Sequence, residues 1–371
     1  MTRSRERMLV TPTSTRALIL SLSIIVGLVA SFSGCGTDRP TMPRESGWYS
    51  LGFENHIARD LEVAWPYLYA GAGQDGIFRR RINRSGEEWE YMGLAHADMA
   101  DTTFDSRMTV FVGDVLALDG GDILCGITSF APWFPGLYRS TDRGASWRVS
   151  DAGIADTLCP YESNVFSLES SSCDPEVCFA ATQGVIYKSN DRGVTWTQLF
   201  GYICGGLGIT DLEVHTRNCD VIWATGQTNR FGHYLLASRD GGETWEDIDF
   251  RAVAPGATNA VFHISLDPFN EDLAYIWTLR GPARTTDGGG TWRPHSFAWA
   301  QEGFGPILFD DRRQGHCFVR AGDIYESWDG GKTAEALESP HKSSIRDMEY
   351  DSRRRILYVG TTSGVYKYVS P

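Results

Sequence analysis

The feature of this sequence that most restricts its fold is an eight-residue motif that recurs about every 49 residues. Four full copies end in tryptophan, at positions 140–147 (STDRGASW), 189–196 (SNDRGVTW), 238–245 (SRDGGETW) and 285–292 (TTDGGGTW). Two degenerate copies flank them: INRSGEEW, which has Arg84 in place of the aspartate, and SWDGGKTA, which keeps Asp329. A fixed period of about 40–50 residues indicates a repeat architecture.

Each repeat contains four short strand signals. In the unit that ends near residue 200 they are NVFSLES, VCFAATQ, VIYKSND and TWTQLF. Strands of this length and number, repeated at this period, are typical of the blades of a β-propeller. The 40 glycines and 12 tryptophans of the chain, with few helix-forming runs, also favour an all-β protein.

The last repeat has only three strand signals, IRDMEYD, ILYVGTT and GVYKYVS, before Pro371. The missing fourth strand is available at residues 47–53 (GWYSLGF), which read like the tryptophan-led strand of the other units. Pairing of this segment with the last blade would satisfy both free strand edges. We therefore predict an all-β, seven-bladed β-propeller of four-stranded antiparallel blades over residues 47–371, closed by strand 47–53.

Residues 1–34 are predicted to be a lipoprotein signal peptide. Four arginines precede the apolar run ALILSLSIIVGLVASF, which is short for a membrane span and leads into SGC. This arrangement resembles the lipobox of bacterial lipoproteins, so we expect lipidation at Cys35 and a tether over residues 35–46. Phe32 stands where that motif usually has leucine, which leaves conventional cleavage or an uncleaved anchor open. Glycine at position 36, directly after the predicted lipidated cysteine, resembles the signal that sorts lipoproteins to the outer membrane in two-membrane bacteria. We therefore expect the protein at the outer membrane or cell surface.

The charge of the chain argues against a nucleic-acid partner. The formal net charge is -13, and removal of residues 1–34 takes away four of the 34 basic and one of the 47 acidic residues, giving -16. A surface of this sign repels phosphates. We expect the membrane link to come from the lipid, and we expect a monomer without a cofactor or metal.

Seven cysteines follow Cys35, and the predicted compartment is oxidising, so disulfides are expected. Cys173 and Cys178, in CDPEVC, could staple a hairpin. Cys159 and Cys204 are 45 residues apart, about one repeat, and could face each other on adjacent loops. The odd total leaves at least one thiol unpaired unless it bonds another chain.

The recurring motif falls between the third and fourth strands, where the chain must reverse. Its aspartate can accept hydrogen bonds from backbone N–H groups just ahead, and its glycine allows a left-handed conformation. A catalytic carboxylate has no reason to recur once per blade. We therefore assign a structural role to Asp142, Trp147, Asp191, Trp196, Asp240, Trp245, Asp287, Trp292 and Asp329.

The motif resembles the Asp-box, or BNR repeat, of sialidases, sortilin-type receptors, xyloglucanases and the photosystem II assembly factor family. The resemblance extends over essentially the whole chain after the signal and implies a propeller. It says little about function, because these families share the hairpin and differ in chemistry. The photosystem II assembly factors are similar in architecture, and their resemblance implies a non-catalytic scaffold that holds or assembles another protein.

A ligand site is expected on the face opposite the Asp motifs. Two long loops should lie there, SFAPWFPG (129–136) and GQTNRFGH (226–233). They offer aromatic and charged groups for a peptide or a sugar ring, namely Trp133, Phe134, Arg230, Phe231 and His233. Packing against neighbouring loops is the alternative role. The connection 93–107 gathers His96, Asp98, Asp101 and Asp105, which we interpret as a solvated acidic loop rather than a cation site.

Catalysis is not expected. Sialidases carry an Arg-Ile-Pro signature, whereas the nearest string here is RRRIN (79–83), with Asn83 in place of proline and within a predicted strand. Xyloglucanases of this type use two propellers, and this chain has length for one. We therefore predict a protein-interaction or assembly scaffold with an unknown protein or glycan ligand. The alternative is a carbohydrate-active protein, either a glycan-binding module or a divergent glycoside hydrolase.

Overall fold

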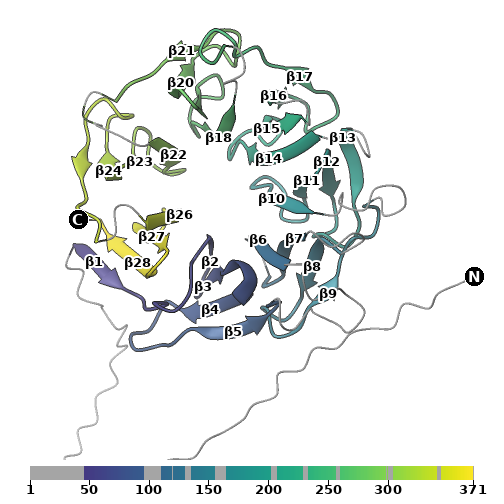
Figure 1. The fold of residues 1–371 in the computed structure, drawn as a ribbon, viewed down its shortest axis with the longest axis vertical. Helices are drawn as coiled ribbons and strands as arrows, with labels where there is room; N and C mark the ends of the chain where they lie inside the picture. The colour runs from purple at the N-terminus through teal and green to yellow at the C-terminus, as the bar shows by residue number, and fades with distance from the viewer. Residues whose placement is uncertain are drawn as a thin grey trace, which may run out of the picture.

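Each repeat folds into a four-stranded antiparallel sheet, and seven such sheets surround a common axis as the blades of a propeller (Figure 1). The computed structural model describes residues 46–95, 110–118, 120–129, 135–154, 164–201, 207–228, 233–255, 260–297, 299, 304–340 and 344–370. The predicted fold class is confirmed. The described residues also include a short 3-10 helix, η1 (Gly73–Asp75).

Each blade has one strand nearest the axis, followed outward by three more. The innermost strands are β2 (Asp60–Ala64), β6 (Val110–Ala117), β10 (Val165–Ser170), β14 (Leu207–Val214), β18 (Val261–Leu266), β22 (Phe304–Phe309) and β26 (Ile345–Asp351). The second strands are β3 (Tyr67–Gly71), β7 (Ile123–Ser129), β11 (Cys178–Thr182), β15 (Ile222–Thr228), β19 (Ala274–Thr278), β23 (Cys317–Ala321) and β27 (Ile356–Thr361). The third strands are β4 (Ile77–Arg81), β8 (Leu137–Ser140), β12 (Val185–Ser189), β16 (His233–Ser238), β20 (Gly281–Thr285), β24 (Asp323–Ser327) and β28 (Gly364–Val369). The outermost strands are β5 (Glu90–Gly93), β9 (Arg148–Val149), β13 (Thr197–Gly201), β17 (Glu246–Asp247), β21 (Arg293–Pro294), β25 (Glu335–Ala336) and β1 (Gly47–Ser50).

The ring closes as the sequence predicts, because β1 pairs antiparallel with β28 and completes blade seven. Gly47 lies opposite Val369, and Ser50 lies opposite Tyr366. The indole Nε1 of Trp48 donates to the Leu337 carbonyl of blade six at 2.6 Å. Strand β1 ends at Ser50 rather than at residue 53. The first strand of the fold thus seals the last blade.

The second strands form the most buried layer, since side chains on both of their faces pack against neighbouring blades. All five residues of β11 and of β19 are buried. Between blades four and five, Trp223 is fully buried and meets Trp292 edge-on, with 6.0 Å between ring centroids. Packing between adjacent blades therefore supplies the hydrophobic core.

The Asp motif forms the turn between the third and outermost strands. Asp191 accepts hydrogen bonds through Oδ1 from the backbone N–H groups of Val194 (3.0 Å) and Thr195 (2.8 Å), and through Oδ2 from the Thr195 hydroxyl (2.6 Å). These hydrogen bonds lower the pKa of Asp191 despite the opposing effect of burial. The Trp196 indole donates to the carbonyl of Ser150 in the preceding blade. The carboxylate is thus committed to the hairpin.

The same carboxylate contacts recur in the other full copies and in the SWDGGKTA copy. The carboxylate of each motif accepts from the backbone N–H and hydroxyl four residues ahead, as seen at Asp142, Asp240, Asp287 and Asp329. The tryptophans differ, since Trp147 bonds Met92 of the preceding blade and Trp245 bonds Gly242 of its own turn. These contacts support the structural role inferred for the motif.

The expected Cys173–Cys178 pairing is wrong. Cys173 is bonded to Cys219, 46 residues away, across blades three and four. Cys178 begins β11 and its thiol is buried in the core, whereas Cys173 lies in the exposed turn before that strand. The side chains therefore point into different environments. Cys159 and Cys204 lie outside the described residues.

The predicted signal peptide, the lipidated Cys35 and the tether also lie outside the described residues. Within the described part of the chain, no helix is long and apolar enough to cross a membrane.

Candidate functional site

The antiparallel order of the strands gives the propeller two different faces. Turns from innermost to second strand and from third to outermost strand lie at the same edge of every blade. This edge carries the Asp motifs, and we call it the Asp-motif face. Turns between second and third strands, and connections between blades, lie on the opposite face.

The ligand residues predicted on the opposite face fall mostly outside the described residues. This applies to Trp133, Phe134, Arg230 and Phe231, and also to the acidic loop residues His96, Asp98, Asp101 and Asp105. His233 is described: it begins β16, is half-buried, and has its pKa lowered chiefly by burial. The predicted site on this face therefore stays a prediction.

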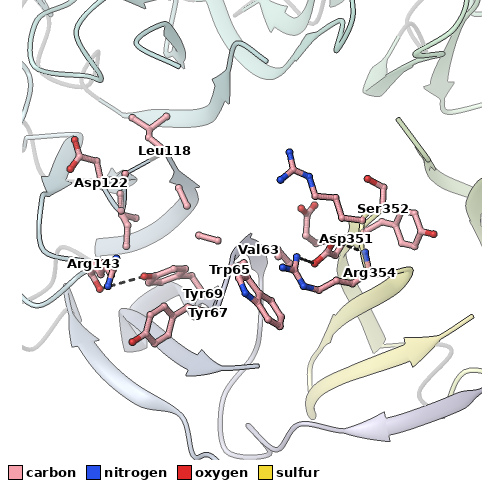
Figure 2. A pocket seen from close by; sticks show the side chains of 18 residues that line it. Val63, Trp65, Tyr67, Tyr69, Leu118, Asp122, Arg143, Asp351, Ser352 and Arg354 are labelled. Carbon is pink, nitrogen blue, oxygen red and sulfur yellow. Dashed lines mark hydrogen bonds and ion pairs between the residues drawn. The ribbon is translucent and has the colours of Figure 1, made fainter. Parts of the chain in front are cut away.

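The described chain contains a pocket of about 530 Å³ on the Asp-motif face. Its walls come from blade one (within residues 63–69), blade two (within 117–123, with Arg143) and blade seven (349–354). Arg143 belongs to the Asp motif of blade two, which fixes the face on which the pocket opens. Figure 2 shows Trp65, Tyr67 and Tyr69 between Arg143 on one side and Arg354 on the other.

On the blade-seven wall an arginine lies over the ring of an exposed tryptophan. The guanidinium carbon of Arg354 is 3.4 Å from the ring centroid of Trp65, which is 46% exposed. Asp351 holds this arginine in place by accepting from its backbone N–H (3.0 Å) and from Nη1 (2.8 Å). Stacking and a charge-assisted hydrogen bond together fix the guanidinium before any ligand arrives.

On the opposite wall the backbone of Arg143 is fixed by blade one. Its carbonyl accepts from Arg79 Nη1 at 2.7 Å and from the Tyr69 hydroxyl at 3.5 Å. Arg79 also stacks on Tyr67 at 4.6 Å and pairs with Glu90 at 2.6 Å. The first arginine of the RRRIN string therefore supports the pocket wall.

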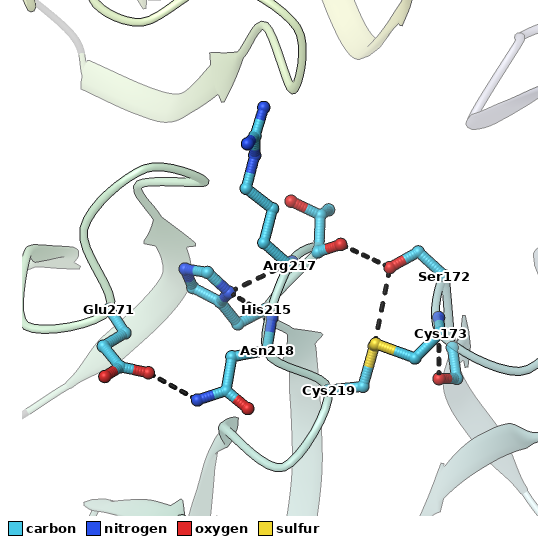
Figure 3. The surroundings of a disulfide bond; sticks show 9 residues. Ser172, Cys173, His215, Arg217, Asn218, Cys219 and Glu271 are labelled. Carbon is cyan, nitrogen blue, oxygen red and sulfur yellow. Dashed lines mark hydrogen bonds between the residues drawn. A yellow bond between two sulfur atoms is a disulfide. The ribbon is translucent and has the colours of Figure 1, made fainter.

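The turns on this face are braced to one another across blades three, four and five. Ser172 donates to the Thr216 carbonyl, beside the Cys173–Cys219 disulfide (Figure 3). Asn218 then donates to Glu271 of blade five. The turn after β14 is thus held from both sides.

Bracing continues through blades six and seven. Arg217 stacks on Phe269 at 4.0 Å and donates to the Asp311 carbonyl of blade six at 2.8 Å. Arg313 of blade six donates in turn to the Ser352 carbonyl of blade seven at 3.3 Å. The blade-seven turn that lines the pocket is therefore held by blade six.

A second exposed tryptophan lies on the same face, in blade six. Trp328 is 50% exposed and stacks on the buried ring of His316, with 3.9 Å between ring centroids. His316 is held by Asp310 through Nδ1 (2.7 Å) and by Glu326 through Nε2 (3.0 Å). Arg355 of blade seven lies over Trp328 at 5.7 Å. The turn of blade seven thus carries arginines toward both tryptophans.

The innermost strands bring carboxylates together around the axis. We call these groups the axial carboxylates: Asp60, Glu62, Asp114, Glu169, Asp211, Glu213, Asp347 and Glu349. Burial is the main cause that raises the pKa of each, to about 8 for Glu62 and about 7 for Asp114. Repulsion between neighbouring carboxylates contributes at several of them.

These carboxylates also join neighbouring blades. Asp60 accepts from the Val115 N–H, and Asp114 accepts from the Leu168 N–H, each in the next blade. Asp347 of blade seven accepts from Leu61 of blade one at 2.8 Å. Such acceptors stabilise the ring. Among the described residues, no group of three or more His, Cys, Asp or Glu is arranged to hold a metal ion.

Comparison with known proteins gives no family assignment, since no family model matches the chain. Among curated proteins, the chain is 27% identical over 204 residues to "Probable oligoxyloglucan-reducing end-specific xyloglucanase" of Neosartorya fischeri. The match covers 48% of this chain and 24% of that protein. The chain therefore spans about a quarter of the length of this relative.

Solved structures with similar folds include YCF48 from Cyanidioschyzon merolae, with a TM-score of 0.60 and 16% identity over 87% of this chain and 99% of that chain. YCF48 bound to D1 peptide gives 0.61 and 15% over 88% and 98%. The Niastella koreensis GH74 enzyme gives 0.59 and 14% over 84% and 52%. At these identities the similarity shows a shared propeller fold.

Proposed function

We propose that this protein is a non-catalytic interaction or assembly module that binds a protein partner at the Asp-motif-face pocket. The observation that carries the proposal is the stack of Arg354 on exposed Trp65, fixed by Asp351 at the rim of the pocket. Aromatic and arginine side chains held in place before binding are typical of the energetically dominant residues of protein interfaces. The sequence predicts a ligand site on the opposite face, so the experiment must also identify the binding face.

Two further findings support binding over catalysis. Five axial carboxylates, Asp60, Glu62, Asp114, Asp211 and Asp347, accept a backbone N–H group of the next blade, which gives them a structural use. YCF48, which has a similar fold over nearly its whole length, has been solved bound to D1 peptide. A propeller of this size can therefore hold a peptide without a second domain.

The test is quantitative capture of partners from envelope extract by the purified protein and by Trp65→Ala. We expect the substitution to remove a specific partner while the melting temperature changes little, because the indole is half-exposed. Equal capture by both proteins would refute binding at this pocket. Tyr49→Ala, at another exposed aromatic residue on the outer strand β1, is the matched control.

A carbohydrate-active role is the second candidate, and the relation to a xyloglucanase sequence favours it. Trp65, Tyr67 and Tyr69 give the pocket an aromatic lining of the kind that sugars use. Incubation with xyloglucan oligosaccharides, followed by measurement of reducing ends, separates the two functions. Turnover would overturn the non-catalytic role, whereas binding without turnover would indicate a glycan-binding module.

We also propose that Cys35 is lipidated and anchors the protein outside the cytoplasm, at the outer membrane or cell surface. The support is the basic and apolar segment that leads into SGC. Fractionation of cells that express wild type and Cys35→Ala tests it. We expect the wild type in the membrane fraction and a shift of the variant out of that fraction, and equal distribution would contradict lipidation at this cysteine.

A further inference from the structure

On the basis of the proposed protein-binding function, we infer that the pocket takes a carboxylate side chain from an acidic peptide segment, with the Arg354 guanidinium as its main contact. Among the described residues, Arg354 donates side-chain hydrogen bonds through Nη1 alone, to Asp351. Its Nε and Nη2 groups are thus available to a ligand. A planar guanidinium with two adjacent donors matches a carboxylate.

The charges that line the pocket support an anionic ligand. Arg143, Arg353 and Arg354 contribute three positive charges, and Arg353 is exposed. Three carboxylates also line the pocket, Asp122, Glu349 and Asp351. Asp122 pairs at 2.5 Å with Arg139, which is outside the lining, and Asp351 pairs with Arg354. The lining therefore holds as many arginines as carboxylates, in a chain whose net charge is -13, so this place is less acidic than the chain as a whole.

The state of Glu349 is consistent with this balance. Burial, together with the neighbouring Glu62, Asp347 and Asp351, raises the pKa of Glu349 well above its ordinary value. Glu349 therefore holds its proton to higher pH than an exposed glutamate, which reduces its repulsion of an incoming carboxylate.

The geometry of the stack favours a carboxylate over a neutral sugar ring. A sugar binds an aromatic residue by lying on the ring face, but Arg354 already covers one face of Trp65 at 3.4 Å. A carboxylate would approach the edge of the guanidinium in its own plane and leave the stack intact. The aliphatic walls at Val63, Leu118 and Ile123 suit the methylene groups of a peptide side chain rather than the hydroxyls of a uronic acid.

The test uses a fluorescein-labelled peptide of alternating glutamate and leucine, its counterpart with glutamine at each glutamate position, and tri-galacturonic acid. Binding is measured by fluorescence anisotropy or calorimetry. We expect the glutamate peptide to bind better than the other two probes, with an affinity that weakens as salt rises. Arg354→Gln should weaken binding by about tenfold or more, the size of a lost charge-assisted hydrogen bond.

Two further variants keep the result interpretable if Arg354→Gln disturbs the turn. Arg353→Gln removes an exposed lining arginine, for which we expect a smaller loss of affinity. Arg251→Gln is the matched control, since Arg251 is exposed and paired with Asp249 away from the pocket. We expect no loss of affinity from this control.

Tighter binding of tri-galacturonic acid, or unchanged peptide affinity in both Arg354→Gln and Arg353→Gln, would overturn the inferred ligand. Capture of a partner that depends on Trp65 but not on Arg354 would also overturn it, while leaving the proposed function in place. Equal capture of partners by the wild type and Trp65→Ala would instead refute the proposed function itself.

Discussion

Replacement of Asp191 by alanine should reduce stability and leave ligand binding unchanged. The carboxylate accepts four hydrogen bonds within its hairpin, from Ser189 Oγ (2.7 Å), the N–H of Val194 (3.0 Å), and the N–H (2.8 Å) and hydroxyl (2.6 Å) of Thr195. Because the group is partly exposed, each bond contributes about 0.5–1 kcal/mol, so the total loss is roughly 2–4 kcal/mol. For a ring of this size the expected fall in melting temperature is about 3–6 °C.

The assay is thermal unfolding followed by circular dichroism, with peptide affinity measured on the same preparations. Asp191→Asn keeps one acceptor oxygen and should lose about half as much stability as the alanine variant. Glu176→Ala serves as the control in the same blade, because it removes one surface ion pair with Arg192, worth at most about 1 kcal/mol. An Asp191→Ala protein with unchanged melting temperature and weakened binding would refute the structural role of the motif.

Three further predictions concern the rest of the ring. The pKa values of Glu62 (about 8) and Asp114 (about 7) are raised, so the folded chain keeps protons that the unfolded chain releases near pH 4. The free energy of unfolding measured with denaturant should therefore fall as pH rises from about 4 to about 8. Glu62→Gln should flatten this dependence, and a stability that rises over this range would contradict the prediction. Reduction of the Cys173–Cys219 disulfide, which closes a loop of 46 residues, should cost about 4 kcal/mol in the unfolding free energy measured with and without reductant, while a Cys178→Ser protein keeps its response to reductant. Trp48→Ala should loosen the closing strand, with a loss of about 2–3 kcal/mol and faster proteolysis near the termini, and an unchanged cleavage rate would count against closure by β1.

The blade count and the closure of the ring could be predicted because their signals are local and repeated. Each Asp motif marks one hairpin by residues that a tight turn requires, and its hydrogen bonds stay within eight residues. The incomplete last repeat and the tryptophan-led segment at Trp48 then specify which strands must pair. Periodicity was sufficient for the architecture.

The pocket could not be predicted in the same way, because its walls meet only through ring closure. Trp65 and Arg354 are separated by almost the whole propeller in sequence, and they touch because blade seven lies beside blade one. The sequence shows both the arginine run at 353–355 and the tryptophan at position 65. No local sequence signal indicates that these two segments contact each other.

The axial carboxylates left a visible signal that a strand-by-strand interpretation misses. Asp60 and Glu62 alternate along one innermost strand, and Asp347 and Glu349 repeat the pattern in another. Alternation by itself reads as a solvent-facing side of a strand. Asp60 accepts a hydrogen bond from the Val115 N–H of the next blade. This contact depends on how the blades pack, which the pattern within one strand does not specify.

The disulfide error has a simple cause. Spacing of about one repeat relates Cys159 and Cys204, whereas the predicted Cys173–Cys178 pair relies on closeness in sequence. Cys173 and Cys219 are 46 residues apart and occupy equivalent turns of adjacent blades, so the one-repeat rule also describes them. Repeat spacing is the better guide wherever two cysteines fall in equivalent turns.

The most direct test of the central claim is a comparison of two exposed apolar residues on opposite faces. Trp65 lies at the Asp-motif-face pocket, and Leu279 lies in the turn between β19 and β20 on the other face, where it is 59% exposed. Envelope capture is measured with wild type, Trp65→Ala and Leu279→Ala. We expect Trp65→Ala to lose the partner and Leu279→Ala to retain it, and the reverse result would contradict binding through the Asp-motif face.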